Sequence, residues 1–193
     1  VIPGNHEFYK QFDISKLYDG WSLQIRENIL CCYNSVIPLN DETELIATTL
    51  WGRIGLQDAF RTESVISDFR RIRWACEPLD WVRFNEEHDR CFRFLEQQVN
   101  RSTAKHIVVV THHVPSFELV APEFKGSPLN GAFAVELGNY IAASPIEYWI
   151  YGHSHRNIDK VIGNTRCVSN QLGYVFGNEH SSFNTSAYIE IID

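Results

Sequence analysis

Three short polar segments, each containing histidine, follow three apolar runs of this 193-residue chain. Gly4-Asn5-His6-Glu7 follows the apolar run Val1-Ile2. Thr111-His112-His113 follows Ile107 to Val110, and Gly152-His153-Ser154-His155 follows Tyr148 to Tyr151. Short apolar runs rich in β-branched and aromatic residues are typical of strands. In open α/β sheets, ligands and metals gather at strand ends. We therefore expect a fold that brings the three segments into one site.

Hydrophobic periodicity predicts helices over residues 13–29, from about Pro78 to Asn100, and over 132–143. Strands are expected at 31–37, 44–51, 107–110, 146–151, 158–162, 165–168 and 187–192. Gly163-Asn164 fits the turn of a hairpin. Residues 107–110 are almost continuously β-branched, which predicts a strand buried on both faces. The order of elements favours α/β layers with some antiparallel pairing.

Composition narrows the class of protein. The net charge is −7, which argues against a protein whose main partner is nucleic acid. The five cysteines show no C-x-x-C spacing, which favours reduced thiols over a zinc–thiolate site. The chain contains no apolar run of transmembrane length. We therefore expect a cytoplasmic protein with no membrane partner.

The residue types in the three segments suit a metal site. Neutral imidazole is the commonest metal ligand near neutral pH. His153 and His155, one residue apart, would face the same side in an extended segment or reach two adjacent ions from a loop. Asn5 can offer a carbonyl oxygen to a metal, and His6 beside it can donate a proton. Each segment alone fits an ordinary turn, but the three together favour metal binding.

The three motifs resemble those of the calcineurin-like metallophosphoesterases. That family carries, in order, D-x-H, G-D-x-x-D, G-N-H-D/E, a His near a strand end, and G-H-x-H, and this chain matches the last three. The similarity extends to residues 1–9, Thr49-Leu50-Trp51 and residues 69–73, so it covers essentially the whole chain. It implies a single metallophosphoesterase domain over 1–193 with the family's four-layer α/β/β/α sandwich.

The resemblance also implies roles for the matched residues. Asn5, His112 and His153 would bind one of two divalent metal ions, and His155 would bind the other. His6 would stand beside the leaving-group oxygen as proton donor or charge stabiliser. The implied reaction is hydrolysis of a small phosphomonoester or phosphodiester by a hydroxide that two Mn, Fe or Zn ions share.

Two details of the matched motifs remain open or secondary. In the His112-His113 pair the first histidine is preferred as the ligand, because the family usually places it first, and His113 is the alternative. Glu7 would be structural and would shape the turn after Asn5.

The D-x-H and G-D-x-x-D motifs are not found in the chain, where only Val1 to Pro3 precede Gly4. We therefore expect an N-terminally incomplete domain that lacks the first strands and holds one ion or none. Exposed sheet edges would favour a homo-oligomer. Two interpretations stay open: a truncated phosphoesterase, or a short form that serves as a non-catalytic scaffold or protein-interaction module.

Two further regions have alternative interpretations. Arg70, Arg71 and Arg73 could clamp a substrate phosphate through bidentate hydrogen bonds, or form a solvated face paired with Asp68 and Glu63. The long loop 114–130, with Phe117 and Phe124, could cover an apolar or aromatic part of a substrate, or be an ordinary surface loop.

Overall fold

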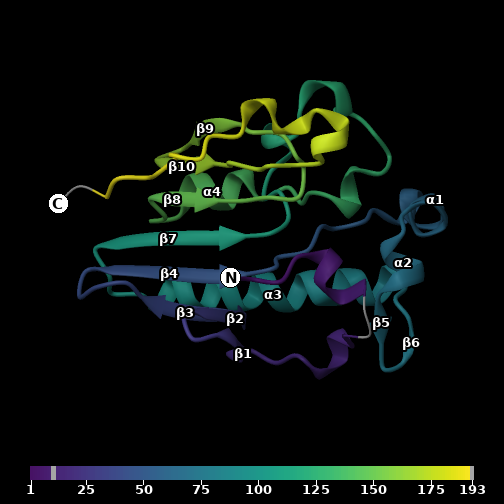
Figure 1. Cartoon of the computed structure of the whole chain (residues 1–193), viewed down its shortest axis with the longest axis horizontal. Coiled ribbons are helices and arrows are strands. Elements are labelled where there is room, and N and C mark those ends of the chain that lie inside the picture. The colour runs from purple at the N-terminus through teal and green to yellow at the C-terminus, as the bar shows by residue number, and fades with distance from the viewer. Residues whose placement is uncertain (10–11, 192–193) are drawn as a thin grey trace.

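The structure is a computed structural model that describes residues 1–9 and 12–191 (Figure 1). Its centre is a six-stranded mixed sheet in the order β3-β4-β7-β8-β10-β9. The strands are β3 (Ser35–Pro38), β4 (Thr43–Thr48), β7 (His106–Thr111), β8 (Tyr148–Ile150), β9 (Asp159–Ile162) and β10 (Thr165–Val168). The predicted α/β class is confirmed.

The four inner strands β4, β7, β8 and β10 are parallel, while β3 and β9 pair antiparallel at the two edges. β7 lies between β4 and β8, and its residues Ile107 to Val109 are at most 3% exposed, as the β-branched run predicts. Parallel strands end at the same edge of a sheet. The residues that follow β4, β7 and β8 therefore come together there.

Helices α3 (Trp81–Arg101) and α4 (Gly138–Ala143) supply the helical side of the larger core. Asp80 begins α3 by accepting the backbone N–H of Arg83 at 2.7 Å. Leu95 and Val99 of α3 pack with Ile141 of α4 and with sheet residues. The helices predicted from about Pro78 to Asn100 and over 132–143 are confirmed with altered bounds, because α3 begins after Pro78 and α4 covers only the second half of 132–143.

A second core lies beside the first turn of α3. It joins the N-terminal segment to α1 (Ala59–Val65), α2 (Asp68–Arg71) and the small sheet of β5 (Arg73–Trp74) and β6 (Glu77–Pro78). Phe8, Trp51, Phe69 and Phe84 are its large aromatic members. Asn5–Tyr9 form a single 3-10 turn anchored by Phe8, and this anchoring positions the Gly4-Asn5-His6-Glu7 motif.

The helix predicted over 13–29 is wrong. This segment is a 3-10 turn at Ile14–Lys16 followed by a hairpin of β1 (Trp21–Arg26) and β2 (Ile29–Tyr33). Asp13 accepts the backbone N–H groups of Ala75 and Cys76 at 3.0 and 2.8 Å, which ties this segment to a distant part of the chain. Gly20, with a φ of +83°, then turns the chain into the hairpin.

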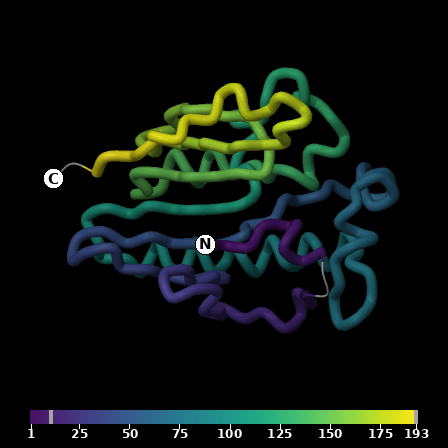
Figure 2. Tube along the Cα trace, viewed as in Figure 1, coloured from purple at the N-terminus to yellow at the C-terminus, as the bar shows by residue number. Residues whose placement is uncertain are grey.

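Other strand predictions need smaller corrections. The strand predicted at 31–37 is divided between β2 and β3 at Asn34, whose φ is +44°. Residues 187–191 form no strand, and Ile192 lies outside the described residues. Figure 2 shows the end of the chain, in yellow, running beside the sheet, where the Tyr148 hydroxyl donates to the carbonyl of Glu190 at 2.9 Å.

The described residues thus form one large sheet and two small antiparallel sheets, β1–β2 and β5–β6. The loop 114–130 is built largely from 3-10 turns at Phe117–Leu119 and Pro122–Phe124, with a further turn at Asn130–Ala132. Among these residues, no helix has the length and apolarity that a bilayer crossing requires.

Candidate metal centre

Asn5, His112 and His153 meet at the edge where the parallel strands end. His112 follows β7 directly, and His153 lies in the loop after β8. The Nε2 atom of His112 is 3.0 Å from Oδ1 of Asn5 and 2.9 Å from Nδ1 of His153. Three residues far apart in the sequence therefore present three donor atoms to one place.

The orientation of the Asn5 amide follows from its other contact. Its Nδ2 donates to both oxygens of Asp68, at 3.0 and 3.1 Å, so Oδ1 must face His112. Asp68 is 2% exposed and also accepts a hydrogen bond from the Tyr9 hydroxyl. The buried carboxylate thus holds the amide so that its oxygen, and not its nitrogen, faces the two imidazoles.

The three ligand atoms suit a shared metal ion better than they suit hydrogen bonds with one another. A neutral imidazole carries one N–H, so a single proton between His112 and its two neighbours leaves at least one lone pair without a good partner. A cation satisfies all three lone pairs. Ligand atoms about 2.1 Å from one metal lie about 3 Å apart in an octahedral shell, close to the separations found here.

Burial keeps both imidazoles neutral. It lowers the pKa of His112 to about 4, helped by the charges of His6 and His155. It also lowers the pKa of His153 well below its usual value, with smaller contributions from the neighbouring histidines. Because metals bind the neutral ring, both residues are held in the ligating form near neutral pH.

Close packing fixes the two rings. A Cβ on Gly4 would lie 2.5 Å from Cε1 of His112, so the ring rests on the bare glycine. Gly152 donates its backbone N–H to the carbonyl of His112 at 3.1 Å. Phe133 stacks on His153 with ring centroids 5.0 Å apart. His153 and His155 have φ values of +68° and +50°, an uncommon conformation for non-glycine residues that clusters at functional sites.

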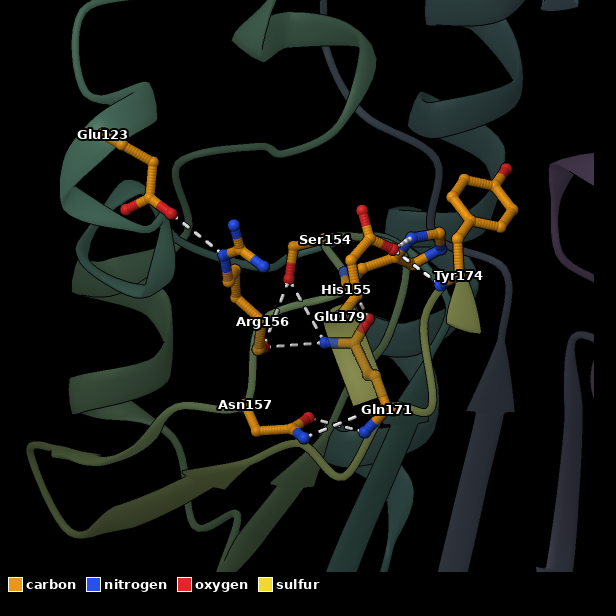
Figure 3. Close-up of polar contacts among 8 residues, drawn as sticks. All are labelled: Glu123, Ser154, His155, Arg156, Asn157, Gln171, Tyr174 and Glu179. Atoms are coloured by element: carbon orange, nitrogen blue, oxygen red, sulfur yellow. Dashed lines mark hydrogen bonds and ion pairs between the residues drawn. The ribbon is translucent and has the colours of Figure 1, made fainter. Parts of the chain in front are cut away.

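His155 is held separately, as Figure 3 shows. Its Nδ1 lies 2.8 Å from Oε2 of Glu179, and its backbone N–H donates to Oε1 of Gln171 at 2.8 Å. A carboxylate on one ring nitrogen fixes the tautomer and leaves the other nitrogen able to ligate a metal. Within the described part of the chain, however, no three His, Cys, Asp or Glu side chains are grouped to hold an ion.

The remaining predicted residues take different positions. His6 is exposed and lines the same cavity as Asn5. Glu7 accepts the backbone N–H of Gly4 at 2.8 Å, within the turn itself. His113 is completely buried with its Nδ1 3.3 Å from the Thr49 carbonyl, so His112 is the histidine that faces Asn5.

The three arginines lie outside this cavity. Arg70 donates to the carbonyl of Ser64 at 2.9 Å, Arg71 lies over the Tyr9 ring, and Arg73 is exposed in β5. Among residues 1–9 and 12–191, none of these arginines forms the alternative ion pair with Asp68 or Glu63 either. Asp68 binds Asn5 and Tyr9, and Glu63 accepts the backbone N–H of Trp81 at 3.1 Å.

The cavity around the metal-ligand candidates measures about 690 Å³. Sequence reasoning missed several polar residues in its wall, namely Tyr9, Asp68, Arg156 and Glu179. Arg156 could have been identified from the sequence, because it directly follows the Gly152-His153-Ser154-His155 motif. Asp68 adjoins the stretch 69–73 that carries part of the resemblance. Glu179 lies in a loop with no motif.

The chain belongs to the calcineurin-like phosphoesterase family, whose model matches residues 1–157. The resemblance drawn from the three motifs is thereby confirmed, and it suggests phosphoester hydrolysis. The chain is 27% identical over 220 residues to the uncharacterized protein L509 of Acanthamoeba polyphaga mimivirus, covering 98% of this chain and 72% of that protein.

A solved structure is also similar. It is a Staphylococcus aureus protein, provisionally assigned as a 5'-nucleotidase and crystallised with α-ketoglutarate. It aligns with a TM-score of 0.44 and 15% identity over 88% of this chain and 31% of its own. This chain thus spans under a third of that protein's length.

Histidines withdrawn from water predict an acid-sensitive fold. Loss of solvent contact lowers the pKa values of the buried His88 and His113 and of the partly buried His112 and His153. Protonation therefore favours the unfolded chain, whose histidines titrate near 6.5, so stability is full above about pH 6.5 and falls as the pH drops. A histidine with a folded pKa of about 4, as for His112, would cost about 3 kcal/mol by pH 4.

Urea unfolding of the metal-free protein at pH 7.5 and pH 5 would test this. We expect the lower free energy of unfolding at pH 5. A His113→Leu variant should show a shallower fall, since it removes one of the buried rings. Equal stability at the two pH values would contradict the expectation.

Proposed function

We propose that this site belongs to a metal-dependent hydrolase of small phosphoesters. The observation that carries this is the meeting of Asn5 Oδ1, His112 Nε2 and His153 Nδ1 within about one coordination shell, in a chain of the calcineurin-like phosphoesterase family. All three residues come from the family motifs, and they border a cavity of small-molecule size.

The donor set suits a divalent transition metal. Nitrogen and oxygen ligands without thiolate accommodate Mn, Fe and Zn alike. Asn5, His112 and His153 would hold one ion, while His155, backed by Glu179, would face a second in a complete dinuclear site. A bound pair of ions supplies a water of lowered pKa and neutralises charge on the phosphate oxygens.

The chain's own side chains would handle the substrate. His6, exposed at the cavity, would protonate the departing alkoxide oxygen. Arg156 also lines the cavity, and its Nε donates to Glu123 at 2.9 Å, which leaves other N–H groups of the guanidinium for a phosphate oxygen. We assign phosphate contact to Arg156 because Arg70, Arg71 and Arg73 lie elsewhere.

The sheet edges bear on how the site is completed. Val36 of β3 and Val161 of β9 are 37% and 60% exposed, and Leu23 and Ile25 of β1 are 50% and 45% exposed. We infer that the family's α/β/β/α sandwich is completed by further strands, supplied by a longer polypeptide or a second copy of this chain. The carboxylate that bridges the two ions would arrive with those strands.

Metal content and hydrolysis should be measured together on the purified chain. We expect about one Mn per chain and little turnover of bis-p-nitrophenyl phosphate. Two ions per chain with turnover would mean that a partner copy completes the site. Purified protein that retains no Mn, Fe or Zn after each is added would contradict the metal-site assignment and favour the scaffold interpretation.

A further inference from the structure

We propose that the cavity receives a phosphoester whose alcohol portion is a flat, apolar ring, and that Phe124 is the main residue selecting it. This rests on the proposed function, because the phosphate would lie at the metal-ligand candidates. It names the substrate class, which the family does not determine.

Much of the cavity lining is apolar. The residues that we call the apolar wall are Val65, Ile66, Val120, Ala121, Phe124, Leu129 and Phe133. Phe133 stacks on His153, so the wall begins directly beside the ligand cluster. A phosphate at the cluster and a ring on the wall can therefore belong to one small molecule.

Several polar groups along this wall already have partners. Asn130 donates its Nδ2 to the carbonyl of Phe124 at 2.8 Å, and Ser127 accepts the backbone N–H of Leu129 at 3.3 Å. The backbone N–H groups of Phe124 and Phe133 donate within their own 3-10 turns at 2.9 Å. Sugar hydroxyls placed here would exchange water for few protein partners, so the wall suits an apolar ring better than a polyol.

The wall is anchored at both ends. A Cβ on Gly131 would lie 2.6 Å from the carbonyl oxygen of Arg53, so two backbone segments are in direct contact there. At the other end, Glu123 pairs with Arg156, which links the turn that carries Phe124 to the loop after β8 (Figure 3). An apolar surface held in place before binding is typical of small-molecule sites.

Phe124 has an unusual exposure for its position. Its side chain is 48% exposed although it lines the cavity, whereas Val120 and Ala121 beside it are 8% and 4% exposed. A half-exposed aromatic ring at a cavity wall offers a flat surface for an offset or edge-to-face contact with another ring. Phe124 therefore contributes more apolar area to a bound ring than any neighbour in its turn.

Phosphonates that cannot be hydrolysed test this pocket. In calorimetric titrations of the Mn-loaded protein, we expect phenylphosphonate to bind on the order of tenfold or more tightly than methylphosphonate. In Phe124→Ala this ratio should fall several-fold while methylphosphonate affinity stays unchanged. Phe117→Ala is the matched control, since Phe117 lies in the same loop, is 42% exposed and does not line the cavity.

The outcomes separate the two assignments. If both phosphonates bind equally, or if Phe124→Ala keeps the ratio, the substrate class is wrong while the phosphate site stands. If neither binds, the phosphate site is wrong and the substrate class falls with it. A metal-free measurement adds an independent check: 1-naphthol should shift the methyl NMR signals of Val65, Ile66 and Leu129, and shifts confined to other methyl groups would overturn the pocket.

Discussion

Replacement of His153 by alanine is expected to abolish stoichiometric metal binding. The side chain supplies one of three donor atoms, and its Nδ1 lies 2.9 Å from the Nε2 atom of His112. Two remaining donors, one of them a weak amide oxygen, cannot compete with water for a divalent ion. The Asn5→Ala variant should behave alike, because it removes the amide oxygen 3.0 Å from the same imidazole nitrogen. Elemental analysis after exhaustive buffer exchange gives the readout.

A matched control is His180→Ala, which removes a histidine that does not line the cavity. This variant should keep the wild-type metal content. Thermal unfolding of the metal-free proteins shows whether each variant still folds, and only folded variants count. Retained stoichiometric metal in folded His153→Ala or Asn5→Ala would overturn the ligand assignment.

The same measurement decides between His112 and His113. His113 is completely buried with its ring centroid 5.2 Å from that of Trp51, and its Nδ1 is turned to the Thr49 carbonyl. We therefore expect His113→Leu, which places an apolar side chain of similar size in the buried position, to retain the metal. His112→Ala should lose it. The reverse result would assign the ligand to His113.

Sequence periodicity predicted the elements in which buried positions recur at a regular spacing along the chain. The strand at 107–110 and the amphipathic α3 belong to this group, because their burial patterns repeat along the sequence. The prediction failed over 13–29, where Asp13 binds backbone groups of Ala75 and Cys76 about sixty residues away. No local pattern encodes such a contact, so the helical spacing of apolar residues there was misleading.

Some residues of the candidate site could likewise be predicted from the sequence, and others could not. Asn5, His112 and His153 could be found from motifs after strands, because the ends of parallel strands necessarily meet. Asp68 could not, since its burial depends on Asn5 and Tyr9, whose neighbourhood in space is set by the second core.

Asp68 is expected to control metal affinity without touching the metal. Both of its oxygens accept from the Asn5 Nδ2, and the Tyr9 hydroxyl donates to one of them, Oδ1. In Asp68→Asn the new side chain presents an NH₂ group as well as an oxygen. The Asn5 amide can then turn over and direct its own NH₂ at His112, which removes one ligand oxygen.

Burial raises the pKa of the Asp68 carboxyl, while the hydrogen bonds from Tyr9 and Asn5 and the charge of His6 act in the opposite direction. Loss of such an outer partner typically lowers metal affinity 10- to 100-fold. We expect a loss of roughly that size for Asp68→Asn in Mn titrations by calorimetry, with a smaller loss for Tyr9→Phe. Asp159→Asn, at an exposed carboxylate paired with Arg166, should leave the affinity unchanged.

A second readout distinguishes orientation of the amide from a general loss of structure. The side-chain ¹⁵N–¹H₂ signals of Asn5 report its hydrogen-bond partners in the metal-free protein, where no ligand bond contributes. In Asp68→Asn these signals should move while the backbone signals of β7 and β8 stay in place. Wild-type affinity together with unmoved Asn5 signals would show that the amide is oriented by its packing in the turn and not by Asp68.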